Sequence, residues 1–92
     1  MVELFKHKDY VTIFAELPIR KVMGIPISYL TPTQTDDGRH ANPQGPIEAC
    51  YDSGKILIIH GHHRYFDVAR RSHGNPKIQV RKIINPFTDI YA

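Results

Sequence analysis

The densest group of side chains able to do chemistry lies at residues 60–64, which are His-Gly-His-His-Arg. Imidazole rings exchange protons near neutral pH, and they also bind metals. A guanidinium binds phosphate through two parallel hydrogen bonds. The run therefore predicts an anion site, a metal site or a general base, depending on the elements that position it.

A phosphate site is expected because a strand, a glycine and a helix follow one another here. The first N–H groups of an α-helix lack an intrahelical acceptor and lie at the positive end of the helix dipole. These groups belong to His62, His63 and Arg64, whose side chains add donors in the same turn. Glycine allows close approach to the backbone. We expect Gly61, His62, His63 and Arg64 to bind phosphate.

A metal site is the alternative at the same place. His60 and His62 are two residues apart, and imidazole suits Zn, Ni or Fe. Further ligands for such a transition metal are available at His40, Asp36, Asp37 and Glu48. The sequence has no CxxC or HExxH pattern to support a metal.

An enzyme built on this site needs a general base beside the phosphate. His62, Glu48 and Asp37 are of suitable type, and His62 and Glu48 are the candidate catalytic residues. The sequence does not place these side chains next to the turn, so the reaction stays open.

The pattern of hydrophobic residues predicts the strands and the helix that position residues 60–64. Lys55–His60 is a continuous apolar run typical of a strand buried on both faces. Residues 62–72 have apolar side chains at helical spacing, with Gly74 and Pro76 as a stop. Residues 77–84 alternate as a strand. The connection is long enough for a crossover to a parallel or near-parallel neighbour.

Further segments complete the expected fold. Residues 10–15 are β-branched and aromatic, which predicts a short strand. Residues 22–30 predict an edge strand or extended segment, because Pro26 lies within them. Residues 31–46 are rich in proline and glycine and predict a long functional loop. The remaining expectations are a strand at 47–51, a hairpin turn at 52–54 and a last helical turn at 85–92.

Composition bounds the class of protein. A chain of 92 residues with 41% hydrophobic content fits one domain spanning residues 1–92, an α/β (α+β) fold with a compact mixed sheet and one or two helices. The single cysteine, Cys50, excludes an intrachain disulfide and favours a reducing cytoplasm. No apolar stretch is long enough to span a bilayer, so we expect a soluble, cytoplasmic protein without a membrane partner.

Basic side chains are scattered along the chain, and the net charge is +3. Such scattering is typical of a solvated face, and it permits non-specific nucleic-acid binding without sequence readout. The residues concerned are Arg20, Lys21, Lys55, Arg70, Arg71, Lys77, Arg81 and Lys82. The sequence leaves the oligomeric state open.

The segment ILIIHGHHRYFDVARR, followed by IQVRKI, resembles the ParB/sulfiredoxin superfamily, which includes the ParB-like nuclease domain. Members carry a strand, a Gly-x-x-Arg turn such as DGHHR or GGCHR, a helix and another strand. The upstream runs IPISYLTPTQ and GPIEACYDSGK resemble the same pattern, so the likeness covers residues 25–84. The resemblance implies a nucleotide or other phosphate ligand, with Gly61, His63 and Arg64 in the phosphate-binding turn.

Members of that superfamily include nucleotide-dependent DNA-partition clamps, sulfinic-acid reductases, free-serine kinases and nucleases. The resemblance implies a nucleotide such as ATP or CTP, together with Mg. Three functions follow as expectations: a nucleotide-binding domain associated with nucleic acid, a nuclease or phosphotransferase, and a catalytically inactive interaction module.

Two residues depart from the superfamily's patterns. His62 stands where the sulfiredoxin turn has its catalytic cysteine, and Cys50 lies outside the turn, so thiol-based chemistry is not expected. His60 stands where kinase-like turns have an aspartate, which argues against a magnesium-dependent kinase. The chain also leaves no room for the helix-turn-helix domain of the partition proteins, so specific DNA binding is not expected.

Overall fold

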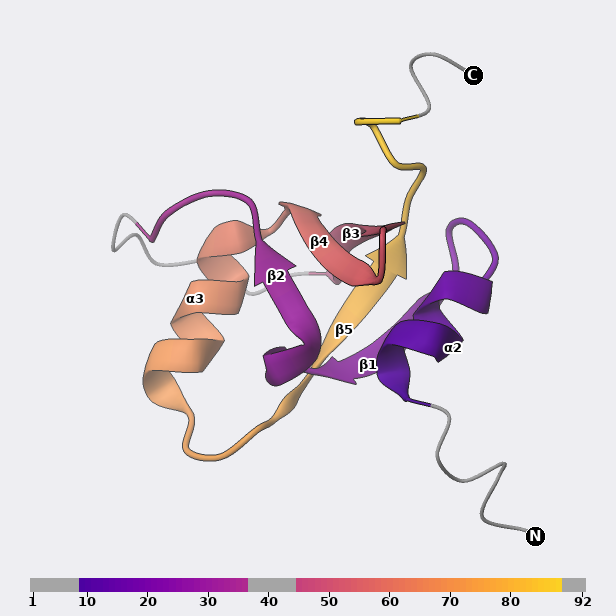
Figure 1. Cartoon of the computed structure of the whole chain (residues 1–92). Coiled ribbons are helices and arrows are strands. Elements are labelled where there is room, and N and C mark those ends of the chain that lie inside the picture. The colour runs from indigo at the N-terminus through magenta and orange to yellow at the C-terminus, as the bar shows by residue number, and fades with distance from the viewer. Residues whose placement is uncertain (1–8, 37–44, 89–92) are drawn as a thin grey trace, which may run out of the picture.

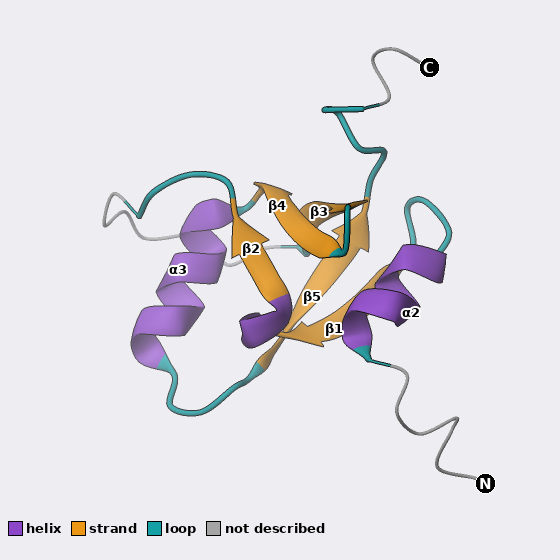
Figure 2. Ribbon diagram, in the orientation of Figure 1, coloured by secondary structure: helices purple, strands orange, loops and turns teal. Residues whose placement is uncertain are grey.

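The computed structural model describes residues 9–36 and 45–88. Within them, a curled five-stranded mixed sheet is accompanied by two α-helices, α2 (Tyr10–Glu16) and α3 (His62–Arg71) (Figure 1). A short 3₁₀ helix, η1 (Ile27–Tyr29), follows the first strand (Figure 2). The expected α+β class, with a mixed sheet and helices beside it, is confirmed.

The sheet combines parallel and antiparallel pairs in the order β1-β5-β3-β4-β2. The pairs β1–β5 and β3–β4 are antiparallel, whereas β3–β5 and β2–β4 are parallel. The strands are β1 (Val22–Pro26), β2 (Leu30–Pro32), β3 (Ile47–Asp52), β4 (Lys55–His60) and β5 (Lys77–Lys82). β1 lies at one edge of the sheet, as predicted for residues 22–30, and β2 lies at the other.

A two-residue turn joins β3 to β4. Ser53 and Gly54 have φ angles of 48° and 81°. Positive φ at both central residues gives a turn whose twist matches that of the flanking strands. The predicted strand at 47–51 and the hairpin turn at 52–54 are confirmed.

β4 is fully buried on one face only. Ile56 and Ile58 are 0% exposed, whereas Leu57 and Ile59 are half-buried. The prediction of burial on both faces was wrong, because continuous burial belongs to all-parallel sheets covered by helices on each side. Here β4 has an antiparallel neighbour, β3.

The connection from β4 through α3 leads to β5, which does not lie beside β4. β5 pairs in parallel with β3, in the register Ile47↔Val80, and β3 separates it from β4. The predicted crossover to a parallel neighbour was therefore wrong, since β4 and β5 run in opposite directions. The helix predicted at 62–72 and the strand predicted at 77–84 are both present, and the strand ends at Lys82.

Helix α2 stands where a short strand was predicted, and that prediction was wrong. Asp9 caps the helix, since its Oδ1 accepts the Thr12 N–H at 2.8 Å. This hydrogen bond also lowers the pKa of Asp9. Phe14, on the helix, is 0% exposed in the core. The cap and the buried helical face together outweigh the β propensity of the segment.

The predicted loop at residues 31–46 begins later than expected. Thr31 and Pro32 belong to β2, where they pair with β4. Residues 37–44 lie outside the described part of the chain. At the C-terminus, residues 86–88 form a turn instead of the expected helix, and the rest of that segment is also outside the described residues.

One hydrophobic core joins the sheet to α2. Its buried members are Phe14, Ile25, Leu30, Ile47, Ala49, Ile56, Ile58, Ile78 and Val80. Tyr65 and Val68 of α3 pack against this core, which fixes α3 relative to the sheet. Neither of the two described α-helices has the length and apolarity needed to cross a bilayer.

Candidate phosphate-binding site

Gly61 forms the junction between β4 and α3. Its φ of 98° and ψ of 23° lie in the left-handed region that favours glycine. A Cβ at this position would stand 2.6 Å from Cγ2 of Ile47 and 2.9 Å from its Cβ. The close approach of β3 therefore requires a glycine here, which is a packing reason where the sequence suggested the approach of a ligand.

The N-terminus of α3 has no side-chain cap and no acidic residue in its first turn. The Tyr65 N–H bonds to the Gly61 carbonyl at 3.1 Å, which begins the helical pattern. The preceding N–H groups, those of residues 62–64, are the predicted donors, and helix geometry gives them no intrahelical acceptor. Their partial positive charge is not offset by a carboxylate in the first turn.

His62 begins the helix but turns its ring into the protein, where it is 3% exposed. Its Nε2 accepts the Thr33 backbone N–H at 3.0 Å, and the Thr33 hydroxyl donates to the Ile58 carbonyl at 2.7 Å. Burial lowers the pKa of His62, and the charges of His63 and His60 lower it further. The ring thus links the segment after β2 to α3, and its contribution to an anion site is its backbone N–H.

Arg64 lies in the first turn of α3 and reaches the chain that enters β3. One of its terminal nitrogens, Nη1, donates to the Gly45 carbonyl. A guanidinium carries five N–H donors, so this bond leaves others for a ligand. Arg64 lies in the first helical turn, as the strand-glycine-helix pattern predicted, and His63 beside it is half-buried.

Glu48 on β3 and His60 on β4 are Cα partners at this end of the sheet, where the register shifts between Glu48 and Ala49. His60 is exposed, and Oε2 of Glu48 is 3.8 Å from Nη1 of Arg81. Of the two candidate catalytic residues, Glu48 is half-buried on β3, whereas His62 is buried with one ring nitrogen hydrogen-bonded to Thr33.

The two candidate metal ligands at the turn, His60 and His62, differ in exposure and in hydrogen bonding. His60 is exposed, and the Nε2 of His62 is already hydrogen-bonded to Thr33. Within residues 9–36 and 45–88, no group of three His, Cys, Asp or Glu side chains is arranged to bind a metal ion. His40 and Asp37 lie outside the described residues.

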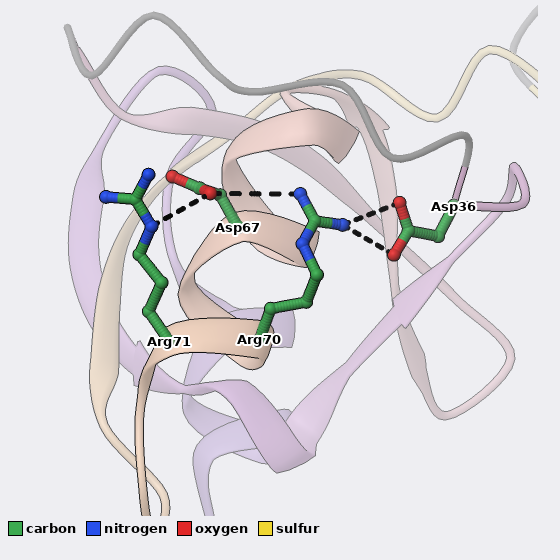
Figure 3. Close-up of polar contacts among 4 residues, drawn as sticks. All are labelled: Asp36, Asp67, Arg70 and Arg71. Carbon is green, nitrogen blue, oxygen red and sulfur yellow. Dashed lines mark hydrogen bonds and ion pairs between the residues drawn. The ribbon is translucent and has the colours of Figure 1, made fainter.

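Asp36, another candidate metal ligand, instead forms an ion pair with the last turn of α3 (Figure 3). Nη1 of Arg70 lies 2.7 and 2.6 Å from the two carboxylate oxygens of Asp36. Asp67 stands between two arginines, with its Oδ1 3.8 Å from Nη2 of Arg70 and 3.2 Å from Nε of Arg71. The Asp36–Arg70 pair attaches the segment after β2 to α3 at a second point, in addition to the contact between Thr33 and His62.

The sequence did not identify two residues that shape the site, Thr33 and Gly45. Thr33 holds the ring of His62, and the Gly45 carbonyl holds Arg64. Both contacts join residues far apart in the chain, and neither residue type has a local pattern that would identify its role. Asp67 was expected to be only a polar helix residue, yet its i+3 and i+4 spacing to Arg70 and Arg71 predicts the ion pairs it makes.

Several basic residues expected on a nucleic-acid surface have other roles. Arg70 and Arg71 are paired with carboxylates, and Lys82 donates to two main-chain carbonyls. Cys50 is 0% exposed in the middle of β3, and a buried thiol is poorly reactive.

Comparison with protein-family models, curated proteins and solved structures finds no match to this chain.

Proposed function

We propose that this chain binds a phosphate-bearing ligand, a nucleotide such as ATP or CTP, at the N-terminus of α3. The observation that carries the proposal is an uncapped helix start that follows β4 through left-handed Gly61 and has Arg64 in its first turn. The GHHR run at this start is the part of the chain that resembles the ParB/sulfiredoxin superfamily. In this proposal Mg enters with the polyphosphate of the nucleotide.

Three physical effects favour an anion at this point. The N–H groups of residues 62–64 supply oriented donors. The helix dipole stabilises a negative charge by about 0.3–1 kcal/mol. A hydrogen bond from a guanidinium to a charged oxygen adds about 1.5–3 kcal/mol. Arg64 contributes the largest of these effects, so it is the residue to change first.

The test is a titration of ATP, CTP and pyrophosphate into the wild-type chain and its Arg64 variants by calorimetry. Arg64→Ala should weaken binding by roughly ten- to a hundredfold, because each 1.4 kcal/mol is tenfold in affinity. Arg64→Lys should recover part of the loss, because lysine keeps the charge but not the planar fork. Thermal unfolding of each variant checks that losing the Gly45 contact leaves the fold intact.

Arg71→Ala is the matched control. Arg71 lies about 10 Å further along the axis of α3, at roughly 1.5 Å per residue, and its side chain is 67% exposed. It should bind as the wild type does. Equal losses in Arg64→Ala and Arg71→Ala would mean diffuse attraction to a basic surface, and an unchanged affinity in Arg64→Ala would place the ligand elsewhere.

The same titration separates binding from catalysis. A nuclease or phosphotransferase is the second candidate, because Glu48 is the Cα partner of exposed His60, the last residue of β4 before the helix start. Release of phosphate from bound ATP, or cleavage of added DNA, would support an enzyme with Glu48 as general base. Binding without turnover would leave a nucleotide-binding interaction module.

A further inference from the structure

Strand β1 lies at the edge of the sheet. Among the described residues it pairs with β5 alone, from Val22↔Arg81 to Pro26↔Lys77. An edge strand presents a row of N–H and C=O groups on its outer side, and a further strand can pair with them.

The printed hydrogen bonds fix which groups of β1 point outward. The Ile27 N–H donates to the Pro76 carbonyl at 3.0 Å, and the Lys82 N–H donates to the Lys21 carbonyl at 2.9 Å. In an antiparallel ladder, alternate residues face the partner strand. Residues 21, 23, 25 and 27 therefore face β5, and the N–H and C=O groups of Val22 and Gly24 face away from it.

No charged side chain protects this edge of the sheet. The five residues, Val-Met-Gly-Ile-Pro, include no charged side chain, although charges on edge strands are a common defence against pairing. Val22 is 42% exposed, which makes it one of the more exposed large apolar side chains of the described residues. Pro26 is buried at the other end of the strand, so the accessible part is Val22 to Gly24.

We propose that β1 is a homodimer interface, in which a second copy of this chain pairs with it in antiparallel orientation. The two-fold axis passes beside Met23, so that Val22 lies opposite Gly24 of the second copy and Gly24 lies opposite its Val22. Each such pair exchanges two hydrogen bonds, and all outward N–H and C=O groups of the two residues are satisfied. The five-stranded sheets of the two copies then become one continuous sheet.

A second copy fits this edge because the strand is complementary to itself. Side chains opposite each other on paired strands lie on the same face. The Val22 side chain would therefore pack beside Gly24 of the second copy, next to the Gln79 and Lys77 side chains that border this glycine on β5. In this register Lys21 falls opposite Ile25 of the second copy, so no like charges meet. A closed two-fold contact of this kind also leaves the second edge, β2, unused.

The test is the mass of the chain in solution, measured by light scattering across the micromolar to millimolar range. The wild type should reach twice its chain mass of 10.6 kDa at the upper concentrations. Val22→Lys should stay at 10.6 kDa throughout, because a charge at an exposed edge position blocks strand pairing.

Gly24→Pro is the second variant, since it deletes an N–H that makes no bond to β5 in the monomer. It should also be monomeric, with a far-ultraviolet circular dichroism spectrum like that of the wild type. Phe87→Lys is the control, because Phe87 is 54% exposed but lies beyond β5, and it should dimerise normally. A wild type that stays monomeric at millimolar concentration would overturn the proposal. The proposal would also be overturned if Val22→Lys still formed dimers, or if Phe87→Lys were the only variant that became monomeric.

Discussion

His62 is held in its neutral form by its surroundings. Its Nε2 accepts the Thr33 N–H, and a proton on that nitrogen would set two N–H groups against each other. Burial, and then the neighbouring charges of His63 and His60, lower the pKa of His62 from its ordinary value of 6.5. The unfolded chain keeps the ordinary value. Below about pH 6.5 the unfolded chain therefore takes up a proton before the folded chain does.

Stability should therefore be complete above pH 6.5 and fall as the pH drops toward the lowered pKa of folded His62. Thermal unfolding from pH 8 to about pH 5 measures this fall. His62→Gln keeps an acceptor for the Thr33 N–H but cannot titrate, so its melting temperature should fall less than that of the wild type. His73→Gln changes an exposed histidine and should behave like the wild type. Equal pH profiles for wild type and His62→Gln would show that the ring does not titrate in this way.

At the scale of elements, Lys82 of β5 stabilises the C-terminal end of α2. Its Nζ donates to the carbonyls of Ala15 and Leu17, each at 2.8 Å. The last carbonyls of a helix lack intrahelical donors, and a cation suits the negative end of the helix dipole. Burial lowers the pKa of Lys82. A helix of seven residues is thus held by Asp9 at one end and by a distant strand at the other.

Lys82→Met keeps most of the apolar stem and removes both charged hydrogen bonds. It should lower the free energy of unfolding by about 1–3 kcal/mol, the range for hydrogen bonds to charged groups. Urea denaturation measures the change. Lys55→Met, at an exposed position at the start of β4, is the control and should change stability by less than about 0.5 kcal/mol. Similar losses in both variants would mean that the contact to α2 contributes little.

The sequence predicted elements whose stabilising contacts are local. The β3–β4 turn and α3 were found because Ser53-Gly54, the helical spacing and the strand flanks are all visible in short windows. α2 was missed because its β-branched residues suggested a strand, although Asp9 before an apolar run and Pro18 after it are helix boundaries. Strand order could not be predicted, since β5 is inserted between β1 and β3 by contacts distant in sequence.

The candidate site was predictable to a similar extent. Gly61 and Arg64 were located correctly at the helix start, because the strand-glycine-helix pattern is local. The inward turn of His62 was not predictable, since it depends on Thr33, 29 residues away. For the same reason the contact of Arg64 with Gly45, 19 residues away, was not expected. The types of the side chains in the sequence indicated which chemistry the site could do, whereas the directions in which these side chains point are set by tertiary packing.

At the scale of the whole molecule, α2 and α3 are tied to the same core. Phe14 of α2 is one of its fully buried side chains, and Tyr65 and Val68 of α3 pack against it. A small domain with a single shared core unfolds in one cooperative step. Tyrosines lie on α2, η1, β3 and α3, at Tyr10, Tyr29, Tyr51 and Tyr65, so the near-ultraviolet signal reports on most of the fold.

Phe14→Ala should therefore lower the stability of the whole chain and not only that of α2. Truncating a buried phenylalanine removes about 3–5 kcal/mol, which is a large share of the 5–15 kcal/mol typical of a small domain. Unfolding followed by far- and near-ultraviolet circular dichroism should give coincident transitions in the wild type, and both should move together in the variant. Phe87→Ala, at a 54% exposed position, should leave both within about 0.5 kcal/mol of the wild type. If Phe14→Ala shifted only one of the far- and near-ultraviolet transitions, α2 would unfold independently of the rest of the chain. The chain would then lack the single cooperative core that holds α3 beside the sheet.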